Sequence, residues 1–276
     1  MTQPITNALT IDFEDWYQGL EIPMSEWKGF EDRIVPVGRR LLKLFAEAGA
    51  RATFFILGKV AQDHPEIVEE IAAAGHEIAT HGYSHTLIYT QTPEVFREEL
   101  ALSIRLLEDI TGHTIRGHRA PFFSVTKQSL WALDVMKDLG IEYDSSIFPV
   151  RNYRYGIEDA PRWPYRIPVQ GGELDEWPIT TWKLHGKSIP VAGGAYFRIF
   201  PYALTRTAFR AINAEGHPAV FYLHPWEIDP GHPRIQLPRR VATITHYFNL
   251  ASTEGRLKQL LRDFRFAPMH EVLHVR

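Results

Sequence analysis

Three acidic residues follow the first apolar run of the chain, where a buried strand is expected to end. The segment ALTIDFEDWYQG, residues 8–19, places Asp12, Glu14 and Asp15 within four positions. Burying carboxylates is costly unless they are paired with cations or bound to a metal. Such a cluster can supply both a metal ligand and a general base to one site.

Two histidines, His81 and His85 in ATHGYSHT, stand four residues apart directly after the predicted strand HEIA. That separation puts two imidazoles on one face of a helical turn, where both can reach one cation. With 13 histidines in the chain, chance can also produce such a pair. Its position favours a metal site, because barrel and open-sheet enzymes build their sites at the carboxyl ends of strands. The chain has no cysteine, so the third ligand is expected to be a carboxylate.

Arg119 and His224 are two further candidates for chemistry. In RGHRAPFF, Pro121 restricts Ala120 to extended geometry and so directs the side chain of Arg119, which could hold a carboxylate ionised or merely lie at the surface. In AVFYLHPWEIDP, His224 follows an apolar strand. It could act as a general acid or base, or be a hydrogen-bonded core histidine.

Other polar and aromatic residues are ambiguous by type alone. His118 suits packing or function, and Asp175 and Glu176 in GELDEWPIT could orient a histidine or face solvent. The stretch AGGAYFRIFP, with Tyr196 and Arg198, could form a flexible aromatic loop that stacks on a sugar, or a packed hairpin.

Short apolar runs that alternate with amphipathic stretches must position these residues. Strands are predicted at 8–13, 52–57, 76–80, 116–119, 140–143 and 219–223, and helices around 37–45, 93–107, 201–215 and 252–264. Residues 148–194 lack helical periodicity and are expected to form long loops and short strands. Alternating strands and helices favour a parallel sheet or barrel, and no linker divides the chain, so one domain is expected.

Composition excludes several classes of protein. The chain has 276 residues, 45% of them hydrophobic, which is enough for a large core. Its 30 basic and 33 acidic residues leave a net charge of -3, which argues against binding to nucleic acid or an anionic membrane. Neither a secretion signal nor a membrane span is recognisable. A cytoplasmic location is therefore expected, or a periplasmic one if a signal was removed.

The order of these motifs resembles a known family. An acid-ending first strand, HGYSH, RAPF, YDSS and YLHPW together are similar to the polysaccharide deacetylases of the NodB-homology class, carbohydrate esterase family 4, over residues 8–225. The tail beyond resembles the subgroup encoded with exopolysaccharide and protein-sorting loci. This resemblance implies an α/β fold, a distorted (β/α)7-type barrel, as a single domain over residues 1–276 with a helical extension at 226–276.

The resemblance also implies a site for Zn²⁺, or for Co²⁺ or Ni²⁺, held by one acid and two histidines. These would be Asp15, His81 and His85, with Glu14 as a substitute for Asp15. Asp12 would act as general base, positioned by Arg119, and His224 as general acid. Substrate contacts are expected from Phe122, Tyr196, Arg198 and Trp226.

The opening acids depart from the family pattern. Most members have two adjacent acids, TFDD, whereas this chain reads DFED. A regular strand would place Asp12 and Glu14 on one face, and a bulge would present Asp15 instead.

The expected activity is removal of N-acetyl groups from amino sugars of a bacterial polysaccharide or its precursor. Two alternatives remain open. One is an allantoinase-like or peptidoglycan-modifying amidohydrolase, and the other is a carbohydrate-binding relative without turnover.

Overall fold

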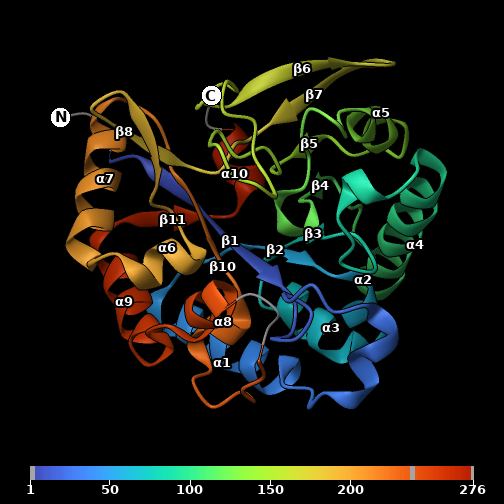
Figure 1. The fold of residues 1–276 in the computed structure, drawn as a ribbon, viewed down its shortest axis with the longest axis horizontal. Helices are drawn as coiled ribbons and strands as arrows, with labels where there is room; N and C mark the ends of the chain where they lie inside the picture. Colours follow the sequence, from blue (N-terminus) through green and yellow to red (C-terminus); the bar gives the residue numbers. More distant parts are fainter. Residues whose placement is uncertain (1–3, 237–239, 275–276) are drawn as a thin grey trace.

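The structure, a computed structural model, describes residues 4–236 and 240–274. A curled sheet occupies its centre and helices surround it (Figure 1). The strands are β1 (Thr6–Phe13), β2 (Thr53–Ile56), β3 (Glu77–Thr80), β4 (Gly117–His118), β5 (Tyr143–Asp144), β6 (Tyr165–Val169), β7 (Gly172–Glu176), β8 (Thr181–Leu184), β9 (Lys187–Pro190), β10 (Val220–Leu223) and β11 (Arg265–Ala267). The helices are α1 (Ile34–Ala48), α2 (Gly58–Asp63), α3 (Pro65–Ala73), α4 (Pro93–Thr111), α5 (Trp131–Asp138), α6 (Gly194–Ile199), α7 (Tyr202–Ala214), α8 (Arg240–Tyr247), α9 (Leu250–Asp263) and α10 (Met269–His274).

The main sheet has the strand order β10-β1-β2-β3-β4-β5-β7-β6, and its neighbours are parallel from β10 through β7. The β6–β7 and β8–β9 pairs are antiparallel hairpins. Beyond β7 the chain reaches the other edge of β10: the Val220 amide donates to the Thr180 hydroxyl at 2.7 Å, and the Tyr222 amide donates to the Ala192 carbonyl at 2.9 Å. The sheet therefore curls nearly to closure, as expected for the distorted barrel.

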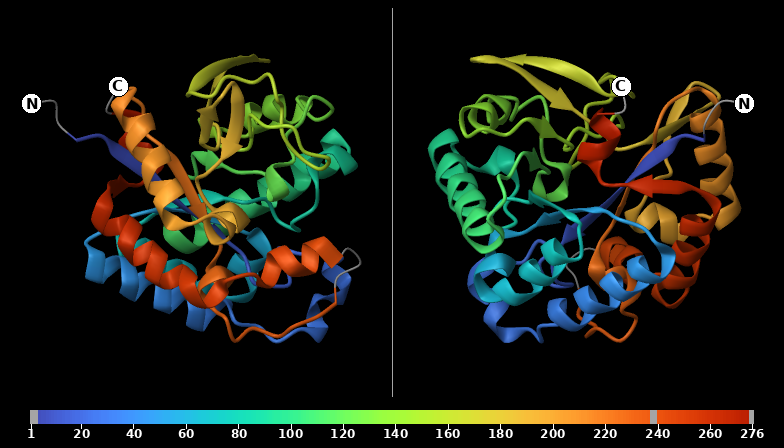
Figure 2. Two further views of the ribbon diagram at one scale, coloured as in Figure 1. Left: turned by 60° about the vertical axis from the view of Figure 1, so that its left-hand side comes forward. Right: turned by 180° about the vertical axis from the view of Figure 1, so that it is seen from behind.

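Helices surround this sheet as a ring of successive neighbours. Packing contacts join α5 to α4, α4 to α3, α3 to α1, α1 to α9 and α9 to α7. Both views of Figure 2 show the helices outside the strands. This arrangement buries the strands on both faces, which explains their nearly continuous apolar sequences.

Local signals set the bounds of the helices that the sequence predicts. The hydroxyl of Thr92 accepts from the Val95 amide at 3.4 Å and Pro93 begins α4, while Gly112, with φ of 69°, ends it. The buried stripe of α1 includes Val37 and Leu41. Helices α7 and α9 also lie where they were predicted.

Two segments differ from expectation. The stretch AGGAYFRIFP, expected as a loop or a hairpin, contains helix α6. The C-terminal extension, expected to be helical, also contains β11, which pairs with Thr6–Ala8 of β1. Strand β11 therefore returns to the central sheet. This long-range pairing could not be predicted from local sequence patterns.

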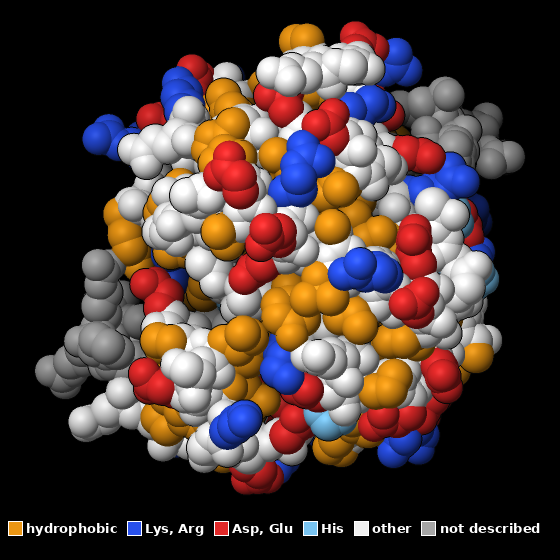
Figure 3. All heavy atoms as spheres, turned by 90° about the vertical axis from the view of Figure 1, so that its right-hand side faces the viewer, with side chains coloured by type: hydrophobic (Ala, Val, Ile, Leu, Met, Phe, Trp, Pro, Cys, Tyr) orange, Lys and Arg blue, Asp and Glu red, His pale blue; other side chains and the backbone are white. Residues whose placement is uncertain are grey.

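Acidic and basic side chains are interspersed on the face of the molecule shown in Figure 3, with hydrophobic side chains between them. Within residues 4–236 and 240–274, no helix combines the length and the apolar character needed to cross a membrane.

Candidate active site

Four of the candidate catalytic or metal-binding residues occupy equivalent positions in the fold. Glu14, His81, Arg119 and His224 each stand at the first position after a strand, following β1, β3, β4 and β10 respectively. Because these strands run parallel within one curled sheet, their carboxyl ends meet at one end of the barrel. The sheet topology thus brings together residues spread over more than 200 positions of the sequence.

Glu14, His81 and His85 form a buried cluster whose ligand atoms lie within 4.8 Å of one another. Glu14 Oε2 contacts Nε2 of His85 and lies 3.7 Å from Nε2 of His81. Burial raises the pKa of Glu14, but His85, His224 and His81 together lower it to about 2. A carboxylate and two imidazoles in this arrangement match the ligand set of a catalytic divalent cation.

The backbone of the neighbouring strand orients His81. Its Nδ1 lies 2.8 Å from the carbonyl oxygen of Arg119 and must donate to it, because a carbonyl only accepts. Burial lowers the pKa of His81 to about 4, so the ring is neutral near pH 7. Nε2 therefore carries the lone pair and faces the cluster, the usual arrangement of a metal-binding histidine.

Asp15, the acid preferred above as metal ligand, is engaged elsewhere. Oδ2 accepts from the backbone amides of Arg33 at 2.6 Å and Ile34 at 2.9 Å, and Oδ1 accepts from the Trp16 amide at 2.7 Å. The carboxylate thus satisfies amides at the start of α1. The choice of Asp15 was wrong, and its substitute Glu14 occupies the cluster.

Arg119 holds Asp12 in a fixed position. Nη1 of this fully buried arginine donates to Asp12 Oδ1 and to the Thr10 hydroxyl, each at 2.7 Å. Its Nε and Nη2 donate to the carbonyl and hydroxyl of Ser145, in the YDSS segment, at 3.0 and 2.9 Å. The guanidinium also lies 4.2 Å from the centre of the Phe55 ring. These contacts leave both groups little freedom to move.

Glu227 orients His224. Its Oε2 lies 3.1 Å from Nδ1 of His224 and accepts from the backbone amide of that residue at 3.0 Å. The second ring nitrogen of His224, Nε2, lies 3.9 Å from Asp12 Oδ2 and 3.8 Å from Glu14 Oε1. Burial opposes the charged ring, but Glu227, Glu14 and Asp12 raise the pKa of His224 to about 9.

Sequence reasoning missed Glu227, although the acid three residues after His224 in HPWE was an available signal. It considered Asp175 and Glu176 instead. Asp175 pairs with Arg166 at 3.3 Å, and Glu176 accepts from the Ile147 amide at 3.0 Å. His118 is also buried and bonds Asp144 at 2.8 Å.

The residues expected to contact substrate have different surroundings. Arg198 is 1% exposed and donates through Nε to Glu227 at 2.6 Å. The prediction that it contacts substrate was therefore wrong, because a buried cation must be paired with an anion in the interior. Trp226, 7% exposed, stacks on His224 with ring centres 5.2 Å apart and so supports the imidazole. Phe122 and Tyr196 are half-buried and stay predictions.

Phe122 lies beside the cluster in a strained conformation. Its ring centre is 4.4 Å from that of His85, and its φ is 54°, while that of His85 is 56°. Non-glycine residues held in this region often mark functional sites.

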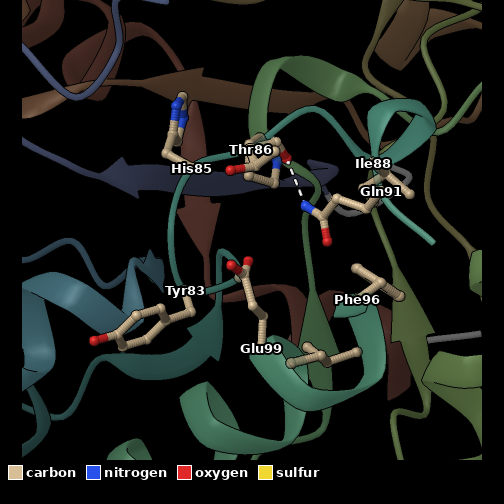
Figure 4. A pocket seen from close by; sticks show the side chains of 10 residues that line it. Tyr83, His85, Thr86, Ile88, Gln91, Phe96 and Glu99 are labelled. Atoms are coloured by element: carbon tan, nitrogen blue, oxygen red, sulfur yellow. Dashed lines mark hydrogen bonds between the residues drawn. The ribbon is translucent and has the colours of Figure 1, made fainter. Parts of the chain in front are cut away.

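A small cavity of about 10 Å³, enough for roughly one water, lies under the loop that carries His85. In Figure 4 the imidazole of His85 points away from Gln91 and Glu99. Gln91 donates to the Thr86 carbonyl at 3.3 Å, and Glu99 accepts from the Ser84 hydroxyl at 2.6 Å. These contacts support the loop on the side opposite the imidazole of His85, which belongs to the cluster with Glu14 and His81.

Comparison with known proteins gives two family matches. Residues 27–143 match the family model for polysaccharide deacetylase, and residues 145–274 match a domain of unknown function, DUF3473. His81, His85 and Arg119 lie in the first match and His224 in the second. Asp12 and Glu14 precede both.

Two curated relatives are similar to less than half of this chain. A peptidoglycan deacetylase of Helicobacter pylori is 32% identical over 124 residues, 45% of this chain and 41% of its own length. A peptidoglycan-N-acetylglucosamine deacetylase of Bacillus cereus is 29% identical and covers 44% of each chain. The chain thus spans less than half the length of these relatives.

Solved structures share the fold over nearly the whole chain. A Mycobacterium smegmatis protein assigned to the polysaccharide deacetylases has a TM-score of 0.62 at 21% identity, covering 100% of this chain and 92% of its own. PuuE allantoinase has a TM-score of 0.61 at 19% identity, covering 97% and 88%. A family 4 carbohydrate esterase of Streptomyces lividans has a TM-score of 0.53 at 14% identity, covering 97% and 93%. At these identities the likeness shows the fold alone.

Proposed function

We propose that this chain is a member of the polysaccharide deacetylase family, a metal-dependent hydrolase that removes N-acetyl groups from the amino sugars of a bacterial polysaccharide or its precursor. The family match and the two deacetylase relatives support the reaction class. The geometry of the site supports the individual roles.

The buried cluster fits a divalent cation. Glu14 Oε2 is inaccessible to solvent, and Nε2 of both His81 and His85 faces it. One carboxylate and two imidazoles, with thiolates excluded because the chain has no cysteine, suit Zn²⁺ or a similar ion. When bound, such an ion would polarise the acetyl carbonyl and stabilise negative charge on its oxygen.

Asp12 and His224 are placed to move protons. Asp12, held in place by Arg119, would take a proton from a water whose oxygen bonds to the acetyl carbon. The carbon–nitrogen bond then breaks, and its electron pair goes to nitrogen, which takes the proton from Nε2 of His224. With its pKa raised to about 9, His224 carries that proton at neutral pH. The products are acetate and a free amino sugar.

The observation that carries the proposal is the meeting of Asp12 and His224, 3.9 Å apart, beside Glu14 of the cluster. The fold alone is insufficient support, because a family 4 pseudoenzyme of Bacillus anthracis has the same fold at a TM-score of 0.50 and 13% identity. A base, an acid and a ligand cluster in mutual contact provide the chemistry that turnover requires.

Acetate release from N-acetylglucosamine oligomers and from peptidoglycan fragments tests this function. We expect release by the protein as purified, loss after dialysis against a chelator, and recovery on adding Zn²⁺ or Co²⁺. His224→Ala should abolish release and retain the metal, as measured by elemental analysis, whereas Glu14→Ala should lose both.

Full activity without metal would overturn the metal mechanism. Hydrolysis of allantoin or another non-sugar amide, with no release from sugars, would replace the substrate class with the amidohydrolase alternative. Sugar binding without any turnover would identify a binding protein.

A further inference from the structure

Arg198 connects the turn after β10 with the C-terminal part of the chain. Its Nε donates to Glu227 Oε1 at 2.6 Å. Its Nη1 donates to three backbone carbonyls around the end of α8: those of Thr245 at 2.7 Å, His246 at 3.0 Å and Phe248 at 2.8 Å. One buried guanidinium therefore fixes the partner of His224 to a segment about 20 residues further along the chain.

Arg256 of α9 makes the reciprocal connection. Its Nη1 donates to three carbonyls around the end of α6: those of Phe197 at 2.7 Å, Arg198 at 3.0 Å and Phe200 at 2.9 Å. Asn249 also donates to the Arg198 carbonyl, at 3.0 Å. Arg198 thus binds carbonyls around the junction of α8 and α9, and Arg256 binds the carbonyl of Arg198 and its neighbours. Helices α6, α8 and α9 lie side by side in Figure 1.

A second contact joins the same segment to the catalytic turn. The imidazole of His246 stacks on Trp226 with ring centres 4.2 Å apart, and Trp226 stacks on His224 at 5.2 Å. The guanidinium of Arg198 lies 5.3 Å from the Trp226 ring. Both the hydrogen-bonded partner and the stacking partner of His224 are therefore held by residues 245–256.

We propose that Arg198 and Arg256 are positioning residues, and that through them residues 245–256 hold Glu227 and thereby the imidazole of His224 in the geometry for proton delivery. The inference rests on the proposed function of His224 as general acid. It gives the C-terminal segment a part in catalysis although that segment contributes no group to the reacting centre.

The choice of leaving group distinguishes positioning of the acid from general stability. An amide nitrogen leaves only when protonated, so its hydrolysis depends on where His224 lies. A 4-nitrophenolate leaves without protonation, so hydrolysis of 4-nitrophenyl acetate needs the rest of the site but not the acid. A displaced imidazole should therefore lower amide hydrolysis and spare the ester.

Arg198 and Arg256 differ in the number of side-chain nitrogens that donate hydrogen bonds. We therefore expect replacement by lysine to have different effects at the two positions. Arg256 makes its three bonds through one nitrogen, and a lysine ammonium also offers three donors from one nitrogen. Arg198 uses two nitrogens for two separate partners, which a single ammonium cannot serve. Arg256→Lys should thus retain function, whereas Arg198→Lys should not.

The experiment compares kcat and KM for acetate release from an N-acetylglucosamine oligomer and for 4-nitrophenyl acetate, in the Zn²⁺-loaded chain of residues 1–276. We expect Arg256→Gln and Arg198→Lys to lower kcat for the amide about 10- to 100-fold, with KM, metal content and ester hydrolysis within about two-fold of the parent. Arg256→Lys should recover most of the amide rate. Arg262→Gln, on the same helix, is the matched control and should change neither substrate, because Arg262 bonds only the Lys258 carbonyl of its own helix among the contacts described.

Equal loss on both substrates, or no loss in Arg256→Gln, would overturn the inference and leave the proposed function intact. If the parent fails to release acetate from sugars, the proposed function fails instead. The NMR signal of the His224 ring then still tests the positioning without turnover: it should shift in Arg256→Gln and not in Arg262→Gln, and an unchanged signal would contradict it.

Discussion

Asp12 and Arg119 form a buried ion pair across 107 positions of the chain, with Nη1 of the arginine 2.7 Å from Oδ1 of the aspartate. The pair joins β1 to the end of β4, two strands that are not neighbours in the sheet. The hydrogen bond holds the carboxylate in a fixed orientation, which suits a general base. The pair also leaves Oδ2 facing His224.

Asp12→Asn should therefore remove the base and keep the fold. We expect kcat for acetate release to fall about 10²- to 10⁴-fold, because the amide cannot take a proton from water. The amide oxygen can still accept from Arg119, so the thermal unfolding midpoint should change little. Metal content, measured in parallel, should stay at the parent level; its loss would assign Asp12 to the metal instead.

Glu14 and Asp15 should separate metal binding from stability. Glu14→Gln should abolish metal retention because it removes the only carboxylate of the cluster described here. Asp15→Ala should retain the metal but lower the free energy of unfolding by about 1–3 kcal/mol, since it leaves amides at the start of α1 without an acceptor. Elemental analysis and urea denaturation measure the two effects, and metal loss in Asp15→Ala would restore Asp15 as a ligand.

Glu227→Gln should shift the pH dependence of the reaction. Activity is lost as pH rises through the pKa of the acid, and Glu227 is the main cause that raises the pKa of His224 to about 9. Without that carboxylate, burial lowers the pKa, so the basic limb of kcat/KM should move to lower pH. Profiles of parent and variant from pH 5 to 10 give the measurement, with circular dichroism as a check on folding. An unmoved basic limb would show that Glu227 does not control the acid.

His76 should make the protein sensitive to acid. Its Nδ1 accepts from the Ala52 amide at 3.1 Å, and burial, with a smaller effect of Arg51, lowers its pKa from 6.5 to about 4. Between these values the unfolded chain binds a proton that the folded chain does not. Stability is therefore complete above pH 6.5 and falls as pH decreases toward 4.

His76→Asn keeps an acceptor near the position of Nδ1 and removes the titration. Its free energy of unfolding should fall less between pH 7 and pH 5 than that of the parent, as measured by urea denaturation at each pH. The matched control is His113→Asn, at an exposed position, which should follow the parent. Parallel pH dependence of His76→Asn and the parent would contradict this origin of the acid sensitivity.

Strand periodicity and motif position predicted a parallel sheet or barrel with most of the candidate site at one end, and the family resemblance implied the distorted barrel. Asp12, His81, Arg119 and His224 each lie in or next to an apolar run, and parallel strands bring their carboxyl ends to one face whatever the loops do. The same reasoning predicted the N-cap Thr92 and the bounds of α7 and α9, because capping and apolar spacing are local properties.

Only the tertiary structure decided which partner each charged side chain near the site binds. Asp15 lies outside the cluster of Glu14, His81 and His85 because its carboxylate accepts hydrogen bonds from backbone amides at the start of α1, 18 and 19 positions away. Arg198 does not face a substrate because its guanidinium is buried and donates to Glu227, 29 positions further along the chain. A buried charge takes the nearest partner in space, and distance in space is set by the packing of whole elements, which residue type and spacing do not encode.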